Sequence, residues 1–235
     1  MKLLAIDTST ETCSVALRVG DAVAVRRHPG AREQTAHVLP LVQALLAEAG
    51  ITLRDLDAIA CGHGPGAFTG VRVAVSVAQG LAYGAQVPAI GISTLAALAQ
   101  QAARLQAGAT HLLPALDARM GELYAGAYAV GDDGLVSALA PDRLVRPDDF
   151  PAGLPALPAG AAWTAIGSGW AAYPDLAARV PVAAGMLTGE PDAEDVLALA
   201  VRAFDRGEAV TAERLLPVYL RDTVAWKKIA EQGKP

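Results

Sequence analysis

The order of strand-like and helix-like segments limits the fold of this chain more than any other feature. Three strand patterns come first, and the two residues Gly20-Asp21 between the second and third predict a hairpin. Strand and helix patterns then alternate, which together with the opening strands predicts an α/β fold with a mixed sheet. The predicted segments are strands 2–8, 12–19 and 22–28, helix 31–49, strand 57–62, helix 71–84, strand 87–92 and a helix capped by Ser93.

A second unit begins near residue 111 and again mixes strands with a helix. Its predicted elements are strands 111–117 and 121–130, an extended segment 134–146, a loop rich in Pro, Ala and Gly over 151–162, strand 163–168 and a helix 192–206 capped by Asp192. We therefore expect two lobes. Residues 1–105 form the first, with the C-terminal segment 215–235 packing back on it, and residues 106–214 form the second, smaller one.

Composition excludes several classes of function. The 24 acidic and 19 basic residues give a net charge of -5, which argues against a chain that grips nucleic acid by itself. Cys13 and Cys61 make no disulfide framework, and Asp7 comes too early for the apolar region of a signal peptide, so we expect a cytoplasmic protein. Residues 73–103 carry no charge, but their Gly and Gln residues and Pro88 predict a buried helix followed by a strand, with no membrane span. The 53% hydrophobic content, against 18% charged, indicates more buried surface than a monomer usually needs.

Two segments have the residue types of a phosphate-binding site. The first follows a buried strand, where a carboxylate and hydroxyls suit a metal-bound nucleotide. The second is a glycine-rich loop between a strand and a helix, where backbone N–H groups meet anions. Each has a structural alternative, a strand-end turn for the first and a tight turn with positive φ for the second. The candidate residues are Asp7, Thr8, Ser9, Gly64, Gly66, Thr69 and Gly70.

The sequence does not indicate residues for metal or nucleophilic catalysis. The histidines His28, His37, His63 and His111 include no His-x-x-x-His pair, so we predict no metal site. Gly167-Ser168-Gly169 misses the Gly-x-Ser-x-Gly spacing of a nucleophile elbow. We therefore expect no catalytic residue and no peptidase activity.

The helices predicted over 31–49 and 71–83 are poor in charge on every side, and Arg72 is the single charged residue of the second. One face of each must cover the sheet. The other faces either the second lobe or another chain, and both interpretations stay open. The candidate partner-interface residues are His37, Val38, Leu41, Leu45, Val73, Val77 and Leu81.

Five short motifs, in this order along the chain, resemble the TsaB (YeaZ) family. They are Leu4-Ala5-Ile6-Asp7-Thr8-Ser9-Thr10, Gly64-Pro65-Gly66-Ala67-Phe68-Thr69-Gly70-Val71-Arg72, Gly91-Ile92-Ser93-Thr94-Leu95, Asp117-Ala118-Arg119-Met120-Gly121-Glu122-Leu123-Tyr124 and Pro217-Val218-Tyr219-Leu220-Arg221-Asp222. Residues 131–205 carry little of the resemblance.

The resemblance implies a two-lobed ASKHA fold (actin/Hsp70-like, ribonuclease H-like) with mixed sheets. It also implies a scaffold and activator in the formation of N6-threonylcarbamoyladenosine at position 37 of tRNAs that read codons starting with A. The family implies a heterodimer with its paralogue TsaD, which holds the metal and catalytic centre, and recruitment of the ATPase TsaE, with threonylcarbamoyl-adenylate supplied by TsaC. In this scheme tRNA is met through the complex, ATP or ADP is a candidate ligand at the interface with partner subunits, and the chain alone forms a homodimer.

Two departures from the paralogue's pattern favour a non-catalytic subunit. TsaD-like proteins bind metal through a His-x-x-x-His pair, whereas here Leu41 stands four residues after His37. The second phosphate loop of the fold presents glycines after its aspartate, whereas Asp117 is followed by Ala118-Arg119-Met120, whose side chains would crowd a phosphate.

Two alternative functions stay open. In a stand-alone ASKHA ATP-binding protein or small-molecule kinase, Asp7 would hold Mg²⁺ and the loop 64–70 would meet phosphate. In a direct tRNA binder, Arg26, Arg27 and Arg32 around the hairpin end would contact RNA, and the simpler interpretation of these arginines is a solvated charged face.

Overall fold

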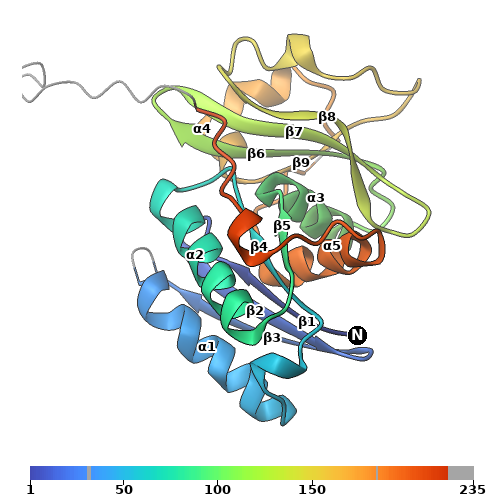
Figure 1. Cartoon of the computed structure of the whole chain (residues 1–235). Coiled ribbons are helices and arrows are strands. Elements are labelled where there is room, and N and C mark those ends of the chain that lie inside the picture. Colours follow the sequence, from blue (N-terminus) through green and yellow to red (C-terminus); the bar gives the residue numbers. More distant parts are fainter. Residues whose placement is uncertain (31–32, 184, 222–235) are drawn as a thin grey trace, which may run out of the picture.

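The structure is a computed structural model that describes residues 1–30, 33–183 and 185–221. Its first sheet has five strands in the order β3-β2-β1-β4-β5 (Figure 1). The strands are β1 (Lys2–Asp7), β2 (Thr12–Val19), β3 (Ala22–Pro29), β4 (Ala58–Gly62) and β5 (Ala89–Ile92). β1 pairs antiparallel with β2 and parallel with β4, so the predicted mixed sheet is confirmed. Because β1 and β4 are parallel neighbours, the residues that follow them meet at one edge of the sheet.

The second sheet has four strands in the order β8-β7-β6-β9. They are β6 (His111–Arg119), β7 (Glu122–Val130), β8 (Val136–Val145) and β9 (Thr164–Ile166). β6 and β9 are parallel while β6, β7 and β8 form an antiparallel meander, so this sheet is mixed as well.

The helices divide the molecule into layers (Figure 1). α1 (Gln34–Ala49) and α2 (Phe68–Ala85) cover one face of the first sheet, and α3 (Thr94–Leu105) and α5 (Ala193–Asp205) lie between the two sheets. The short α4 (Ser168–Ala172) packs on the outer face of the second sheet, where Trp170 is buried and its Nε1 donates to the Leu113 carbonyl at 3.0 Å. Among the described helices, none is both long enough and apolar enough to cross a bilayer.

The two helices between the sheets connect the predicted lobes. α5 lies in the part of the chain predicted as the second lobe and packs on β1, β2, β4 and β5 of the first sheet. α3 lies in the part predicted as the first lobe and packs on the four strands of the second sheet. The two helices contact each other, and a continuous apolar core runs through them from one sheet to the other. A cut of the chain at residue 105 therefore does not separate two independent cores.

Several helix ends follow the sequence signals. Ser93 Oγ accepts a hydrogen bond from Ala96 N at 3.2 Å, and the Asp192 carboxylate accepts one from Glu194 N at 2.9 Å, so both predicted caps are confirmed. Gly50 adopts a left-handed conformation with φ 64° after α1. α2 differs from its predicted bounds, because it begins at Phe68 and runs past Gly84 to Ala85.

The described part of the C-terminal segment packs back on the first sheet and its helices. Leu215 is buried in the core beneath α1 and α2, and Val218 N donates to the His63 carbonyl at 2.7 Å. Arg221 reaches the other lobe, where its guanidinium lies 2.6 Å from the Glu122 carboxylate. Residues 222–235 of the predicted segment lie outside the described residues.

Candidate functional site

The two predicted phosphate-binding segments lie together at the edge where β1 and β4 end. The Asp7 Oδ1 atom accepts hydrogen bonds from the backbone N–H of Ser9 at 2.9 Å and from its hydroxyl at 2.8 Å. Thr8 Oγ1 donates to the Gly70 carbonyl at 2.7 Å, and Ala67 N donates to the Ser9 carbonyl at 2.8 Å. The parallel strand pairing therefore brings the sequence-predicted residues into direct contact.

The chain's own backbone fills the space beside the loop glycines of this site. A Cβ atom added to Gly70 would lie 2.0 Å from the Thr8 carbonyl oxygen, and one added to Gly66 would lie 2.7 Å from the Ser9 carbonyl oxygen. Gly64 has φ 112°, a conformation that side chains disfavour. Because the glycines here admit the chain's own backbone, the geometry supports the structural interpretation of the loop. Thr69, at the exposed start of α2, does not join this closed arrangement.

Asp7 is a buried acid with an unsatisfied oxygen. Its Oδ2 atom has no hydrogen-bond partner. The pKa of Asp7 is raised from 3.8 to about 6. Burial is the largest cause, the hydrogen bonds from Ser9 oppose it, and the carboxylates of Asp192 and Glu190 add to it. Asp7, Thr8 and Ser9 have no exposed surface, so these side chains do not fit a hydrated Mg²⁺ ion with its nucleotide in this arrangement.

The turn that corresponds to the second phosphate loop is also occupied by the chain itself. Arg119 and Met120 have positive φ values of 61° and 57°, and the Asp117 carboxylate accepts from Arg119 N at 2.9 Å. The guanidinium of Arg221 donates to the Ala118 carbonyl at 3.1 Å. Protein groups thus take the hydrogen bonds that a phosphate would need.

The outer face of α1 and α2 is the second candidate site. The predicted partner-interface residues Val38 and Leu45 are wrong for this role, because both are fully buried against the first sheet. Their arc of α1 is the one that packs on β2 and β3. The other five predicted interface residues are partly exposed: His37, Leu41, Val73, Val77 and Leu81.

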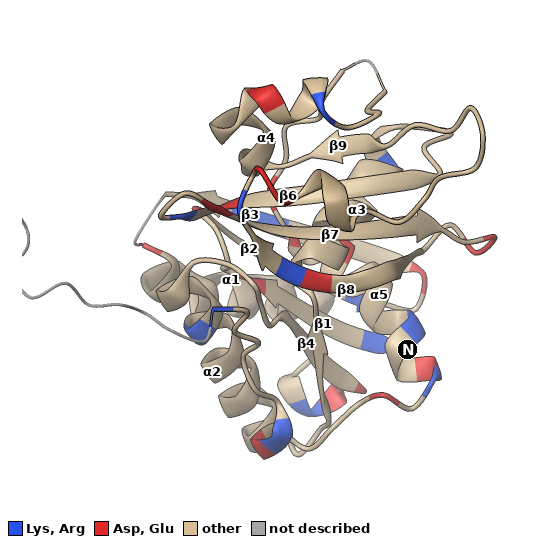
Figure 2. Cartoon of the chain, turned by 90° about the horizontal axis from the view of Figure 1, so that it is seen from above, with Lys and Arg blue, Asp and Glu red and all other residues tan. Residues whose placement is uncertain are grey.

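A shallow groove of about 300 Å³ lies on this face. The sequence did not indicate several of its residues, because the apolar pattern does not show which side of a helix stays open. The groove is lined by Thr35, Phe68, Thr69, Arg72, Val73, Ser76 and Val77. Most of α2 is drawn in tan in Figure 2, which shows that most of its residues are uncharged.

Aromatic side chains stand out from the same face. Phe68 is 59% exposed, and the Arg72 guanidinium lies 3.3 Å from the centroid of its ring. Arg72 Nε also donates to the Tyr219 hydroxyl at 2.7 Å, which places the C-terminal segment beside the groove. Tyr83 of α2 and Leu39 of α1 are exposed as well. An apolar, aromatic patch with a single cation has the composition of a protein–protein interface.

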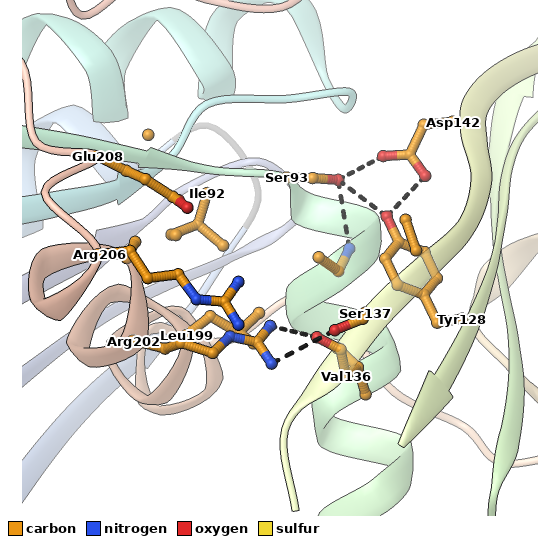
Figure 3. Close-up of a pocket in the computed structure, with 14 residues that line it drawn as sticks. Ile92, Ser93, Tyr128, Val136, Ser137, Asp142, Leu199, Arg202, Arg206 and Glu208 are labelled. Atoms are coloured by element: carbon orange, nitrogen blue, oxygen red, sulfur yellow. Dashed lines mark hydrogen bonds between the residues drawn. The ribbon is translucent and has the colours of Figure 1, made fainter. Parts of the chain in front are cut away.

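A larger pocket of about 410 Å³ opens between the two sheets (Figure 3). Ser93 Oγ and the Tyr128 hydroxyl donate to the two oxygens of Asp142, at 2.5 Å and 2.6 Å. Burial raises the pKa of Asp142. Arg202 and Arg206 of α5 and its extension stand at the opposite wall. The sequence did not indicate this pocket, because its lining comes from segments more than 100 residues apart.

The arginines considered for direct RNA contact are already paired. Arg27 Nε lies 2.6 Å from the Asp192 carboxylate and its Nη2 lies 2.8 Å from that of Glu194. Arg26 Nη2 lies 2.5 Å from the Glu48 carboxylate. Carboxylates therefore neutralise both cations where a phosphate backbone would have to bind. Arg32 lies outside the described residues.

Comparison with known proteins identifies the family. Residues 25–229 match the TsaD family, described as tRNA N6-adenosine threonylcarbamoyltransferase. The chain is 43% identical over 232 residues to the Escherichia coli tRNA threonylcarbamoyladenosine biosynthesis protein TsaB, covering 97% of this chain and 98% of that protein. The corresponding Haemophilus influenzae TsaB is 36% identical over 240 residues, covering 97% of each chain.

Solved structures agree with the sequence relatives. The structure titled YeaZ from Pseudomonas aeruginosa superposes with a TM-score of 0.83 at 42% identity, covering 93% of this chain and 99% of that one. A second Pseudomonas aeruginosa structure, titled an uncharacterized protein with similarity to peptidase YEAZ, has a TM-score of 0.86 at 44% identity, covering 94% and 99%. The predicted two-lobed ASKHA-like fold with mixed sheets is confirmed by these neighbours and by the TsaD-family match. The chain belongs to the TsaB (YeaZ) family.

Proposed function

We propose that this chain is a non-catalytic subunit required to form N6-threonylcarbamoyladenosine at position 37 of tRNAs that read codons starting with A. It acts in the cytoplasm by pairing with its paralogue TsaD through the outer face of α1 and α2 and by recruiting the ATPase TsaE. The apolar groove on that face, beside the exposed ring of Phe68, is the observation that carries the proposal.

The arrangement of the phosphate-type loops supports a non-catalytic role. Asp7, Thr8 and Ser9 are fully buried, and the loop glycines accommodate neighbouring backbone. The arginines near the hairpin are paired with carboxylates, so a partner is the better candidate for contacting tRNA. Substrate chemistry therefore falls to the paralogue, and this chain contributes the surface that holds the complex together.

The mechanism of pairing follows from burial of the groove. Val73 and Val77 are partly exposed and line the groove together with the exposed Phe68. A partner helix laid along this groove would remove these apolar side chains from water, at about 25 cal/mol for each Å² buried. Without the paralogue, a second copy of this chain can cover the same face, which gives the expected homodimer.

The test compares two Val→Glu variants at sites of different character. Val73→Glu places a charge in the groove, whereas Val23→Glu places one on an exposed strand residue that is 49% accessible. We expect Val73→Glu to abolish co-purification with the paralogue TsaD. It should also abolish tRNA threonylcarbamoylation in a reconstituted system that contains TsaD and TsaE. Leu41→Glu, on α1 of the same face, should weaken pairing too. Val23→Glu should retain both properties.

Three outcomes would contradict the proposal. Threonylcarbamoylation at full rate without this chain would remove its role as a required subunit. Full pairing in Val73→Glu, with an unchanged circular dichroism spectrum, would remove α2 from the interface. Micromolar binding of Mg-ATP with turnover by the isolated chain, measured by calorimetry, would favour the stand-alone kinase or ATPase instead.

A further inference from the structure

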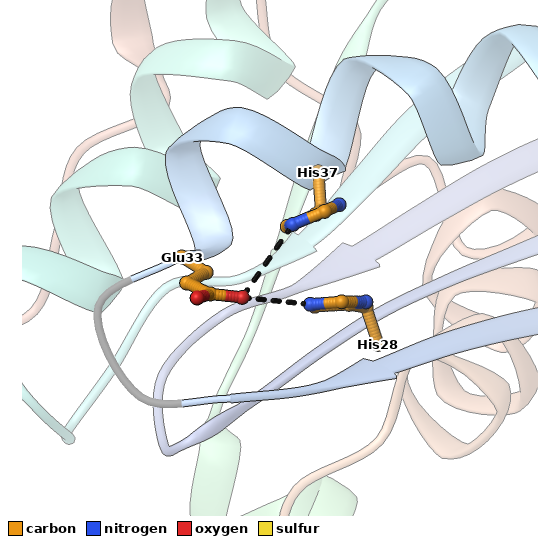
Figure 4. Close-up of side chains that lie close together, drawn as sticks. All are labelled: His28, Glu33 and His37. Carbon is orange, nitrogen blue, oxygen red and sulfur yellow. Dashed lines mark hydrogen bonds and ion pairs between the residues drawn. The ribbon is translucent and has the colours of Figure 1, made fainter.

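Two histidines and a glutamate meet beside the end of β3 and the start of α1 (Figure 4). His28 belongs to β3, Glu33 occupies the N-cap position of α1, and His37 lies one helical turn further on. His28 Nε2 lies 3.1 Å from Glu33 Oε2, and His37 Nε2 lies 3.6 Å from the same oxygen. The predicted absence of a metal site rested on His-x-x-x-His spacing, which does not detect ligands supplied by two different elements.

We propose that His28, Glu33 and His37 bind one divalent transition-metal ion of the zinc type. Two imidazole nitrogens and one carboxylate oxygen form a ligand set that Zn²⁺ uses in proteins. A tetrahedral ion with bonds of about 2.0–2.1 Å separates its ligand atoms by about 3.3 Å, which lies between the two distances in the structure. The hard cations Mg²⁺ and Ca²⁺ prefer oxygen ligands and do not suit two imidazoles.

The two imidazole rings already lie side by side next to Glu33. The two imidazole rings stack with centroids 3.5 Å apart and planes 20° apart, and both turn an Nε2 atom toward Glu33 (Figure 4). To bind one tetrahedral ion the two rings must swing apart, because their in-plane lone pairs now run nearly parallel and would have to meet at about 109°. The side chains are 32%, 60% and 37% exposed for His28, Glu33 and His37, which leaves the fourth tetrahedral position open to water.

The ion would link strand β3 to the start of helix α1. His28 is held by the pairing of β3 with β2, whereas Glu33 and His37 belong to the first turns of α1. Thr35, between these two ligands, lines the apolar groove. Metal binding would therefore restrict the end of α1 that borders the proposed partner face, and it does so whether or not that face binds TsaD.

The experiment titrates tag-free, chelator-treated protein with Co²⁺, whose visible absorption reports tetrahedral coordination, and then displaces it with Zn²⁺. We expect one Co²⁺ per chain and a melting temperature raised by Zn²⁺ and unchanged by Mg²⁺. His28→Gln and His37→Gln should each weaken Zn²⁺ binding by roughly 100-fold or more, since changes even behind the ligands cost 10–100-fold. The control His111→Gln alters a histidine of β6 outside the cluster and should bind as the unmodified chain does.

Two results would overturn the proposal. The first is Co²⁺ binding by the unmodified chain no stronger than binding by the double variant His28→Gln/His37→Gln. The second is an absorption spectrum retained at full stoichiometry in either single variant. Circular dichroism of each variant separates loss of the site from loss of the fold, since three partly exposed side chains are not required for the core.

Discussion

Replacement of Asp7 by asparagine should remove a pH-dependent loss of stability. Asp7 is fully buried, its Oδ2 atom lacks a partner, and burial raises its pKa from 3.8 to about 6. A raised pKa means that the folded chain binds the proton more tightly than the unfolded chain does. The stabilising contribution of the protonated form is thus fully present below pH 3.8, and it is lost as the pH rises to about 6.

The size of the effect follows from the shift of the Asp7 pKa. A rise of about two pKa units corresponds to a loss of about 3 kcal/mol of folding free energy above pH 6. In Asp7→Asn, the side-chain Oδ1 can still accept hydrogen bonds from Ser9, but the group cannot ionise. The variant should therefore gain about 3 kcal/mol over the unmodified chain between about pH 4 and pH 7.

Urea unfolding at a series of pH values measures this gain. The fluorescence of the buried Trp163 and Trp170, together with circular dichroism, reports the transition. Asp21→Asn is the matched control, because it makes the same chemical change at a side chain that is fully exposed. The buried carboxyls Asp142 and Asp195, whose raised pKa values have other causes, are present in all three proteins and cancel in the comparison.

Parallel pH profiles for Asp7→Asn and the unmodified chain would refute this reasoning. They would mean that the Asp7 carboxylate is solvated or paired in solution, so that its burial does not penalise the charged form. The same variant, titrated with Mg-ATP by calorimetry, also examines the alternative nucleotide site at this carboxylate.

Two further paired substitutions test the packing of α1 and α2, both by urea unfolding. Gly70→Ala should cost roughly 1–3 kcal/mol of stability, because its Cβ would lie 2.0 Å from the Thr8 carbonyl oxygen. Gly80→Ala has open space around the new Cβ and should stabilise the helix by roughly 0.5–1 kcal/mol. Equal effects of the two substitutions would contradict the close approach at Gly70. Val38→Ala should cost about 2 kcal/mol, because Val38 is fully buried, whereas Leu39→Ala should cost less than about 0.5 kcal/mol; a larger loss at Leu39 would reverse the assignment of the two helix faces.

Local sequence patterns were sufficient to predict most secondary structure. Alternating side chains over 12–19 and 22–28 and the turn at Gly20-Asp21 correctly predicted the first hairpin. The hydroxyl of Ser93 and the carboxylate of Asp192 correctly predicted two helix starts, since capping depends on residues within one turn. The end of α2 was not predicted, because Gly84 stays within the helix and Gln86 adopts the left-handed conformation instead.

The sequence predicted which residues form the candidate sites, but not what the glycine-rich loop contacts or which interface residues are exposed. The sequence alone identified Asp7 and the glycine-rich loop as candidate phosphate-binding residues and showed that α1 and α2 are poor in charge. It could not distinguish a loop that holds phosphate from one that holds its own backbone, because both need glycines. It also could not separate Val38 and Leu45, which face the sheet, from the partly exposed Val73 and Val77.

By itself, then, the sequence determined the order of elements, the caps, the mixed sheet and the family, all of which depend on local pattern or on motifs in order. Only the tertiary structure decided which sheet each inter-sheet helix covers, since α3 packs on the second sheet while α5 returns to the first sheet, whose strands lie 100 or more residues earlier in the chain. It alone placed His28 beside Glu33 and His37, because a strand and a helix that pack together can join ligands that no sequence spacing relates.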